Sequence, residues 1–562
     1  MKKDKLNGWL AKPISYAFMV NVIFLLIALF AFHPHFEEND DAILAFLIEG
    51  VYGSRETHMV YVNVCLGAVL RLFYTVTAGI RWYSVFQYAA LFVSFTSCTY
   101  LFVKRMKHGK LMSLLLLLFT FYEAYVSLQY SKTAAIVSAA GYLMIFFFFE
   151  EKRKAGCRRI IPVIGSLLIA YAALLRIESF YLATLLFFGV GLYEVYLLFK
   201  EGKGTKEKKT FLQMVSTFLI LFLFIGMTQL IDSKAYANDP GWSYHKAFNQ
   251  DRTDLLDYRY DLLDYSSNQE QLKSLDISEN DALLYLTWQF GDDTVFSQSL
   301  MQNLLSLNGP KQISVKMLKE FVANLYQDIY TLNCYLLGCV MLLILILIGK
   351  EKINLPLLLY IGCALAGVLC YYEYSGRWSH RIVFSVWFLV TVILLYYVSF
   401  SNRSTLLCVL AVSIFMNAGL CLKDQFDYQK YLREEGNSKQ LAEYTTIHQD
   451  ALFLIDPFTD QNLYQYDVFT PYPEGIFRNR TYFGGWLACS PVYRDVLQAY
   501  GYDNPFAALM NGAQDSNIYL IDSCYPDEKL LFLKEHYGVE LIPTQIDIIG
   551  SCRIYQMTSG KK

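Results

Sequence analysis

Long apolar runs recur along this chain, and they constrain its fold more than any other feature. About 20 apolar residues cross a bilayer as one helix, because hydrocarbon leaves backbone polar groups no partners outside the segment. A window of about 19 residues predicts about eleven spans, at Pro13–Phe32, Tyr83–Val103, Leu111–Leu128, Ala134–Phe149, Ile160–Leu175, Phe180–Phe199, Phe211–Ile231, Leu332–Ile348, Leu355–Tyr371, Ile382–Phe400 and Thr405–Cys421. With 55% hydrophobic and only 17% charged residues, the composition also departs from that of a soluble protein. We therefore expect a polytopic α-helical membrane protein.

The basic residues predict the orientation of these spans. Short cytoplasmic loops carry an excess of Lys and Arg. With a cytoplasmic N-terminus, every dense basic cluster falls inside, at residues 104–107, 150–159, 200–209 and 350–352. The outer segments are then residues 33–82, 129–133, 176–179, 232–331 and 372–381, together with everything after Lys423. The C-terminal part is therefore predicted to be extracytoplasmic.

This orientation depends on how Met59–Val76 is interpreted. The segment is apolar enough to be mistaken for a span, but counting it as one would invert every later loop and place the basic clusters outside. We expect instead a helix that lies in the membrane interface, with Arg71 and Tyr74 at its polar edge.

The net charge and the cysteines exclude some functions. A formal charge of −2 gives no reason to expect a nucleic acid partner. Most of the 12 cysteines lie in or beside apolar runs, and no spacing resembles a zinc site. We expect the thiols to pack as small hydrophobes, with one disulfide among Cys489, Cys524 and Cys552 left open.

Two outer segments are long enough to fold. Residues 232–331 carry helix-start signals at Ser278 and Ser314 and a stop at Asn308-Gly309-Pro310, so this block is predicted to be helical. We expect residues 1–421, which include this block, to form a transmembrane module, and residues 422–562 to form a small extracytoplasmic α/β domain. The expected elements of that domain are strands at Ala451–Asp456, Asn517–Asp522, Val539–Pro543 and Ile546–Tyr555 and a helix at Pro526–Tyr537. The alternation of strands and helix favours a partly parallel sheet.

Two adjacent carboxylates, Asp40 and Asp41, follow the first span directly. Paired acids at a membrane surface are a plausible general base. They could instead cap a helix that begins at Ala42, where Asp is favoured. One could act while the other caps, and the sequence does not separate these alternatives.

Further charged residues map to the same outer face. Charges at the edge of a bilayer are costly, so they are candidate functional residues. The candidates for binding a lipid-linked phosphate are Lys132, Arg176, Glu178, Arg252, Arg377, His380 and Arg381. The competing interpretations are an anchoring role for Arg176, whose side chain would reach outward, and an aromatic and basic surface belt at residues 372–381. Because Arg176 and Glu178 are two apart, they would not face each other on a helix.

Several short motifs resemble those of a known superfamily. These are Asn39-Asp40-Asp41, Gly50-Val-Tyr-Gly53, Asn63 with Gly67, Ile80-Arg-Trp-Tyr83, Phe248-Asn249-Gln-Asp-Arg252 and Gly484-Gly-Trp486. Together with the order of spans, outer loops and C-terminal domain, they make the chain similar to the GT-C superfamily of polyprenyl-phosphate-dependent glycosyltransferases. More narrowly, it resembles the membrane proteins of Gram-positive polysaccharide loci.

This resemblance implies that the transmembrane module is GT-C-like and that the protein is an inverting membrane glycosyltransferase at the outer face of a bacterial cell membrane. A polyprenyl-phosphate-linked sugar would be the donor, a cell-envelope glycan the acceptor, and Asp40 or Asp41 the catalytic base. Some such enzymes use a divalent ion, and here Glu37, Glu38 and Asp40 could hold Mg²⁺ or Mn²⁺. No motif for binding a peptide acceptor is visible.

Two alternatives stay open: a polysaccharide polymerase or lipid-carrier translocase, and a non-catalytic membrane scaffold or sensor. A cavity shared by Asp40 or Asp41 with Arg176, Arg377 or Arg381 would favour the enzyme.

Overall fold

The computed structural model describes most of the chain. The described residues are 12–154, 159–202, 204–307, 313–330, 355–398, 402–435, 438–460 and 466–560. The predicted span Leu332–Ile348 lies outside them.

Nine helices of the described part are long and apolar enough to cross a membrane. Each corresponds to a predicted span, which confirms a multi-pass helical membrane protein. They are α2 (Pro13–Ala31), α5 (Trp82–Arg105), α6 (Gly109–Phe121) continued by the π-helix η1 (Tyr122–Val126), α7 (Tyr130–Lys154), α9 (Ile177–Glu201), α10 (Thr205–Asn238), α17 (Leu355–Ser375), α18 (His380–Tyr397) and α19 (Arg403–Glu435). The predicted span at residues 160–175 forms α8 (Ile160–Leu175), which with 16 residues is shorter than these nine. Helix α4 (Val64–Val76) has only 13 residues, which is too short to cross a bilayer.

Several helices extend beyond their predicted bounds. Helix α7 begins at Tyr130, so Lys132 lies in its first turn and not in a loop. Helix α10 runs to Asn238 and α19 to Glu435, well past the apolar windows. A hydropathy window ends where charged residues begin, whereas a helix continues into water as long as its backbone bonds and packing hold. The predicted domain boundary after Cys421 therefore falls inside α19, and the division into two domains stays a prediction.

Helix α7 is the centre of the membrane region. In the most apolar stretch of α7, 94% of the residues are buried, against 22% of the residues in the corresponding stretches of α10, α17 and α19. It packs on α5, α8, α9 and α18. Its close approach to α8 depends on two facing glycines, because a Cβ at Gly141 would lie 2.6 Å from the Gly165 carbonyl oxygen.

The segment that follows α10, called the helical outer segment for its predicted location, is helical in its described part, as predicted. It contains α11 (Pro240–Arg252), the π-helix η2 (Thr253–Tyr258), the 3₁₀-helix η3 (Tyr260–Leu263), α12 (Tyr265–Ser274), α13 (Glu279–Leu286), α14 (Gln298–Leu307) and α15 (Val315–Tyr330). Ser278 forms a capping box with Asp281 at the start of α13. Asp239 caps α11, where Pro240 occupies the first position.

The C-terminal part is a small α/β unit around a five-stranded sheet in the order β4-β3-β5-β7-β6. Its elements are α20 (Ser438–Ile447), β3 (Leu452–Ile455), β4 (Arg480–Tyr482), α21 (Pro491–Gln498), α22 (Pro505–Asn511), β5 (Ile518–Ile521), α23 (Pro526–Tyr537), β6 (Leu541–Ile549) and β7 (Cys552–Ser559). Strands β4, β3 and β5 are parallel, and β7 and β6 are antiparallel, so the prediction of a partly parallel sheet is confirmed. The prediction of one strand over 546–555 is wrong, because the chain reverses at Gly550, whose φ is +61°. The described cysteines of this unit, Cys489, Cys524 and Cys552, are free thiols.

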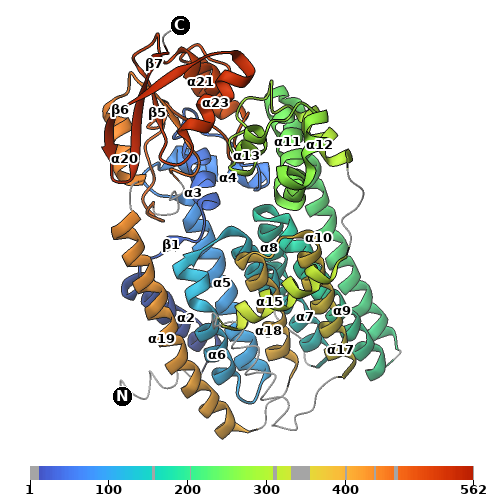
Figure 1. Cartoon of the computed structure of the whole chain (residues 1–562). Coiled ribbons are helices and arrows are strands. Elements are labelled where there is room, and N and C mark those ends of the chain that lie inside the picture. The colour runs from blue at the N-terminus through green and yellow to red at the C-terminus, as the bar shows by residue number, and fades with distance from the viewer. Residues whose placement is uncertain are drawn as a thin grey trace.

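This unit docks on the first outer loop, whose helix α3 (Asn39–Glu49) lies directly beneath it in Figure 1. The Glu49 carboxylate accepts hydrogen bonds from Arg81 Nε at 2.6 Å and from the Tyr472 amide at 3.2 Å. The Gly475 amide donates to the Gly50 carbonyl at 2.8 Å. The loop also pairs with the membrane helices, through the parallel bridge of β1 (His35–Phe36) with β2 (Ser127–Leu128). The loop is therefore fixed on both sides.

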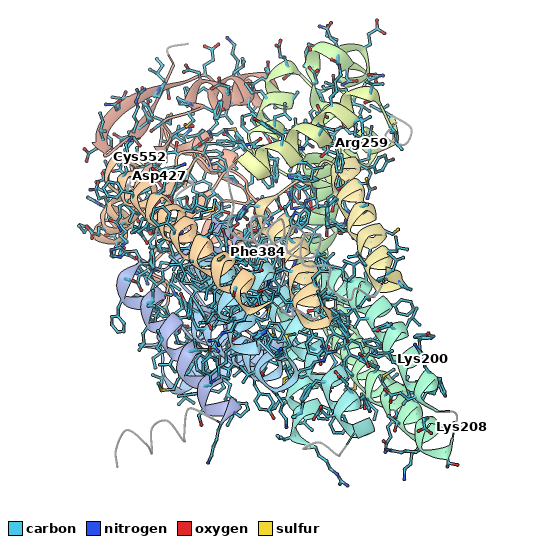
Figure 2. All side chains as sticks on the ribbon, turned by 90° about the horizontal axis from the view of Figure 1, so that it is seen from below. Lys200, Lys208, Arg259, Phe384, Asp427 and Cys552 are labelled. Atoms are coloured by element: carbon cyan, nitrogen blue, oxygen red, sulfur yellow. The ribbon has the colours of Figure 1, made fainter. Side chains whose placement is uncertain are left out.

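Helices α11, α12 and α13 and the C-terminal unit lie together at one end of the molecule, whereas α15 lies among the membrane helices that fill the rest and packs on α17 (Figure 1). Figure 2 shows Lys200, near the end of α9, and Lys208, near the start of α10, on the same side of the molecule.

Candidate functional site

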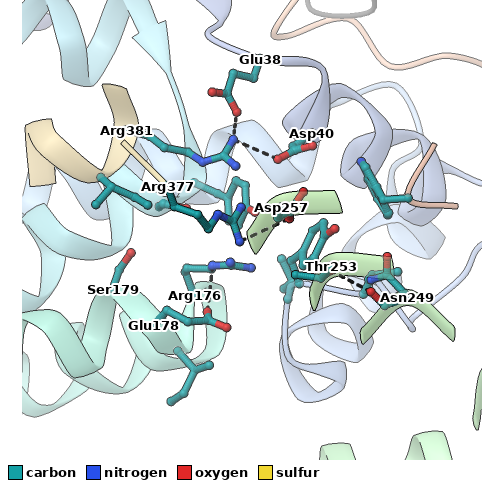
Figure 3. Close-up of a pocket in the computed structure, with 18 of the residues that line it drawn as sticks. Glu38, Asp40, Arg176, Glu178, Ser179, Asn249, Thr253, Asp257, Arg377 and Arg381 are labelled. Atoms are coloured by element: carbon teal, nitrogen blue, oxygen red, sulfur yellow. Dashed lines mark hydrogen bonds and ion pairs between the residues drawn. The ribbon is translucent and has the colours of Figure 1, made fainter. Parts of the chain in front are cut away.

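One large cavity lies where the membrane helices, the first outer loop, the helical outer segment and the C-terminal unit meet. Its volume is about 1780 Å³. Its charged lining includes Asp40, Arg176, Arg252, Arg377 and Arg381. These candidates are scattered along the sequence, and the fold brings them to one cavity. Figure 3 shows Asp40, Arg176, Arg377 and Arg381 there.

Asp40 lies in the first turn of α3 and lines this cavity. Arg381 Nη1 lies 3.2 Å from Asp40 Oδ2 and also pairs with the Glu38 carboxylate. Burial raises the pKa of Asp40, and the charges of Arg176 and Arg252 oppose this rise. A carboxylate with a raised pKa takes up a proton more readily at neutral pH, as a general base must.

Asp41 has a different environment, although it is the next residue. It is fully buried and is not among the residues that line the cavity. Its carboxylate accepts from the Tyr83 hydroxyl at 2.8 Å, Gln87 Nε2 at 3.3 Å and the Tyr130 amide at 3.2 Å. These bonds tie α3 to α5 and α7. Burial raises the pKa of Asp41 to about 8, against the effect of these donors.

Neither aspartate caps a helix that begins at Ala42, so this expectation is wrong. The helix begins at Asn39, and its N-cap residue is Glu38, which makes no side-chain capping bond. Asp40 and Asp41 therefore both lie within the first turn, and the helical twist turns one toward the cavity and the other into the core.

Arg176 and Glu178 pair directly, with 2.8 Å between Arg176 Nε and Glu178 Oε2. The prediction that they would not face each other is wrong, because Arg176 is not helical. It is the extended residue between α8 and α9, with φ −155° and ψ 105°. Its guanidinium carbon lies over the Tyr61 ring, 5.1 Å from the centroid, and over the Tyr130 ring, 5.4 Å from the centroid.

Arg252 and Arg377 share one acid that was not among the sequence candidates. Asp257 lies 3.3 Å from Arg252 Nη1 and 3.4 Å from Arg377 Nη1. Arg252 and Asp257 are five residues apart, a spacing that brings side chains together on a π-helix turn but not on an α-helix. Asp257 lies within the repeated DLLDY motif, but nothing in that motif predicts a π-helix.

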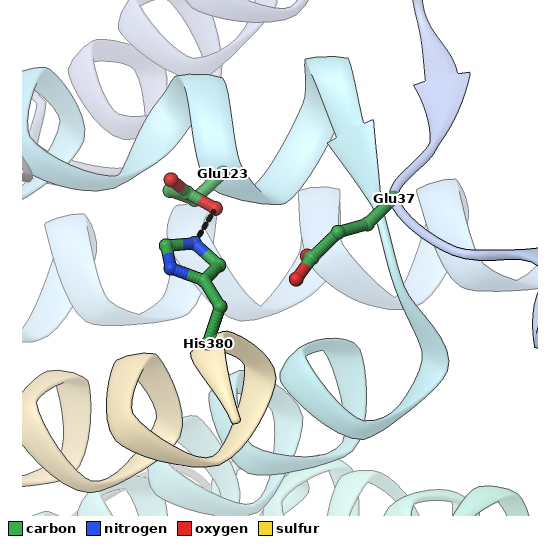
Figure 4. Close-up of side chains that lie close together, drawn as sticks. All are labelled: Glu37, Glu123 and His380. Carbon is green, nitrogen blue, oxygen red and sulfur yellow. Dashed lines mark hydrogen bonds and ion pairs between the residues drawn. The ribbon is translucent and has the colours of Figure 1, made fainter. Parts of the chain in front are cut away.

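Lys132 and His380 form a separate cluster beside the cavity and are not part of its lining. The Lys132 ammonium contacts Glu37 and lies 2.6 Å from Glu123. Figure 4 shows His380 beside Glu123, with 3.1 Å between His380 Nε2 and the carboxylate. The acid and histidine ligand atoms of Glu37, Glu123 and His380 all lie within 4.8 Å of one another.

The three acids predicted to hold a divalent ion are already paired with basic side chains. Glu37 pairs with Lys132, whereas Glu38 and Asp40 both pair with Arg381, so these three acids are divided between two cations. An ion bound by Glu37 and Glu123 would have to displace the Lys132 ammonium. The residues therefore do not fit a ready-made Mg²⁺ or Mn²⁺ site, and metal dependence stays a prediction.

The cavity continues as an apolar groove between α9 and α17. Leu182 and Leu185 of α9 and Val368 and Tyr371 of α17 line it. Tyr371 is 61% exposed and Leu185 is 49% exposed, on helices that are long and apolar enough to span a membrane. The charged cavity is therefore continuous with a surface that lipid would cover.

The fold and this site define a multi-pass membrane protein with a charged cavity between its membrane helices and its C-terminal unit. No protein-family model matches the chain, and no curated protein matches it. Among solved structures, it is similar to ArnT from Cupriavidus metallidurans in the apo state, with 9% identity, a TM-score of 0.40 and 98% of each chain covered. The same protein bound to undecaprenyl phosphate matches with 10% identity, a TM-score of 0.35 and 98% of each chain covered.

Proposed function

We propose that this protein is a GT-C-type membrane glycosyltransferase that takes a sugar from a polyprenyl-phosphate donor and attaches it to a cell-envelope glycan at the outer face. One observation carries the proposal: a cavity-facing carboxylate, Asp40, shares its cavity with four arginines, and that cavity extends to exposed apolar side chains of the membrane helices α9 and α17. A scaffold or sensor would have no need to gather these residues in one place.

The apolar groove suits the lipid chain of the donor, and the arginines suit its phosphate. Arg176 is the best candidate for the phosphate contact, because its partner Glu178 is 59% exposed in its side chain and therefore easily displaced. Helices α9 and α18 both begin at the cavity, and the N-terminus of a helix favours a bound anion. Arg377, held by Asp257, would be a second contact.

Asp40 would act as the general base. It accepts the proton of the acceptor hydroxyl while that oxygen forms a bond to the anomeric carbon, and the bond from that carbon to the phosphate oxygen breaks. The electron pair leaves with the polyprenyl phosphate, whose charge the arginines stabilise. A single displacement of this kind inverts the anomeric centre. Asp41 would hold α3 in place rather than take part in the chemistry.

The orientation follows from the same proposal. The N-terminus is cytoplasmic, and the C-terminal unit and the cavity are extracytoplasmic, in agreement with the positions of the basic loops.

Binding of undecaprenyl phosphate to the purified protein tests the proposal. We expect Arg176→Gln and Arg377→Gln each to weaken binding by about 10- to 100-fold, the effect of losing one hydrogen bond to a charged group. Arg478→Gln, which alters an arginine of the C-terminal unit that bonds Gln449, is the matched control and should bind normally. Undecaprenol lacks the phosphate and should bind weakly to all variants alike. Equal binding of both lipids to wild type and to both cavity variants would contradict the proposal.

A further inference from the structure

The Gly484-Gly485-Trp486 loop joins the C-terminal unit to the helical outer segment. A Cβ at Gly484 would overlap the Trp288 carbonyl oxygen, so only glycine fits there. The next residue, Gly485, has a φ of +80°, and its amide donates to the same oxygen at 3.1 Å. This close packing fixes the position of Trp486 on the cavity wall.

His245 of α11 lies against this loop and also lines the cavity. Its Nε2 lies 3.0 Å from the Trp486 carbonyl oxygen. A carbonyl oxygen only accepts, so Nε2 carries the proton and donates it. Burial lowers the pKa of His245 to about 4, and the ring is therefore neutral at physiological pH, with a free lone pair on Nδ1.

Two buried polar atoms at this point have no hydrogen-bond partner among the described residues. They are Trp486 Nε1, a donor, and His245 Nδ1, an acceptor. Both residues are more than nine-tenths buried. Unpaired buried polar atoms cost stability, so each needs an explanation in a native structure. The Trp486 indole also acts as a donor toward Asp40 and so lowers the pKa of that carboxyl, but the contact lies outside the geometry of a normal hydrogen bond.

The surrounding wall is aromatic. The Tyr61 ring lies 5.0 Å from the Trp486 ring, and Trp288, Tyr482 and Tyr493 also line the cavity. Flat apolar rings with a few precisely placed polar groups are typical of sites that bind small molecules with both apolar faces and hydroxyls. A saccharide has both, and one hydroxyl can accept from Trp486 Nε1 and donate to His245 Nδ1.

We propose that Trp486 and His245 form an acceptor subsite, in which they hold one hydroxyl of a saccharide beside the hydroxyl that Asp40 deprotonates. This inference rests on the proposed function and adds to it a place and a chemical class for the acceptor. It also gives the C-terminal unit a direct part in the site, because it supplies Trp486.

The test measures binding of methyl glycosides to the full-length protein in phospholipid nanodiscs, by ligand-observed NMR titration. The probes are methyl glycosides of common hexoses and N-acetylhexosamines, each with its monodeoxy analogues. Trp486→Phe keeps an aromatic ring and removes the donor. His245→Gln keeps a donor for the Trp486 carbonyl and removes Nδ1. The matched controls are Trp82→Phe, whose indole bonds the Thr77 carbonyl, and His448→Gln, whose ring contacts Tyr444.

We expect at least one glycoside to bind wild type and to lose about tenfold in affinity when a single hydroxyl is removed. Trp486→Phe and His245→Gln should each weaken that glycoside about tenfold and bind its deoxy analogue as wild type does. The controls should behave as wild type. If no glycoside binds wild type, or if the two variants still distinguish the hydroxyl from the deoxy form, the subsite is wrong.

Undecaprenyl phosphate binding, measured on the same samples, separates this inference from the proposed function. Retained lipid binding by Trp486→Phe and His245→Gln shows that they are folded. Failure of wild type to bind the lipid, together with glycoside binding that depends on Trp486, would overturn the proposed function and leave the saccharide subsite standing.

Discussion

Replacing Asp41 with alanine should destabilise the protein far more than the same change at its neighbour Asp40. Asp41→Ala removes a buried acceptor and leaves the Tyr83 hydroxyl, Gln87 Nε2 and the Tyr130 amide without a partner. Each unsatisfied buried group costs about 1–3 kcal/mol, which gives roughly 2–5 kcal/mol for the set because the longer bonds contribute less. Asp40→Ala removes only a contact with Arg381, which keeps Glu38 as a partner, so a change within about 1 kcal/mol is expected.

Thermal unfolding of both variants in one detergent, at one heating rate, measures this difference. A lower midpoint for Asp41→Ala and a nearly unchanged one for Asp40→Ala is the expected result. Equal midpoints, or a lower one for Asp40→Ala, would show that we have assigned the structural role to the wrong aspartate.

The pH dependence of the same unfolding gives a second check on Asp41. Its folded pKa is raised to about 8 by burial, whereas an unfolded aspartate titrates near 3.9. Between these values the folded state holds a proton that the unfolded state has lost, so this group's contribution to stability falls as the pH rises toward 8. Asp41→Asn cannot ionise, and its stability should fall less over this range. Parallel profiles for wild type and Asp41→Asn would contradict the raised pKa.

Three further substitutions have expected outcomes. Arg81→Met leaves the buried Glu49 carboxylate without its cation, so the protein should lose about 3–5 kcal/mol of stability. Adding Glu49→Gln should restore part of that loss, and thermal unfolding of both variants measures the difference. Gly484→Ala places a methyl group against the Trp288 carbonyl and should lower the unfolding midpoint, whereas Gly226→Ala, which meets no neighbouring atom, should not. Lys132→Met leaves Glu37 and Glu123 without their shared cation, so it should lower the unfolding midpoint. The protein that remains folded should bind the lipid phosphate with unchanged affinity. Loss of lipid binding with an unchanged unfolding midpoint would show that Lys132 belongs to the substrate site.

The sequence predicted those parts of the fold that depend on local pattern. Apolar windows located the membrane helices because the bilayer imposes a length and a composition on each one separately. The strands that end at Asp456 and Asp522 were found for a similar reason, and the structure adds why both end in an acid: Lys529 lies between them, 2.7 Å from Asp456 and 2.5 Å from Asp522, fully buried. Strand β4 was missed because its three residues, Arg480–Tyr482, are too short to show a period.

The site was predictable as a list of residues and not as an arrangement. Charge at the membrane edge identified Asp40 and the arginines, but no local pattern indicates which aspartate faces the cavity. That depends on where α3 begins, and helix ends are the least certain feature of a sequence. His245 and Asp257 escaped notice because their significance comes from partners that lie far away in the chain or on an irregular helical turn.

The most direct measurement is the composition of the envelope glycan in a strain from which this gene has been deleted. The deletion strain is complemented with the wild-type gene, with Asp40→Asn or with Asp41→Asn. Mass spectrometry of the isolated glycan reports transfer whatever the identity of the sugar, and membrane levels of each variant are measured alongside. We predict that wild type restores the missing sugar, that Asp40→Asn fails to do so at a normal membrane level, and that Asp41→Asn restores it in proportion to the amount of folded protein. Full restoration by Asp40→Asn would contradict the assignment of Asp40 as the base.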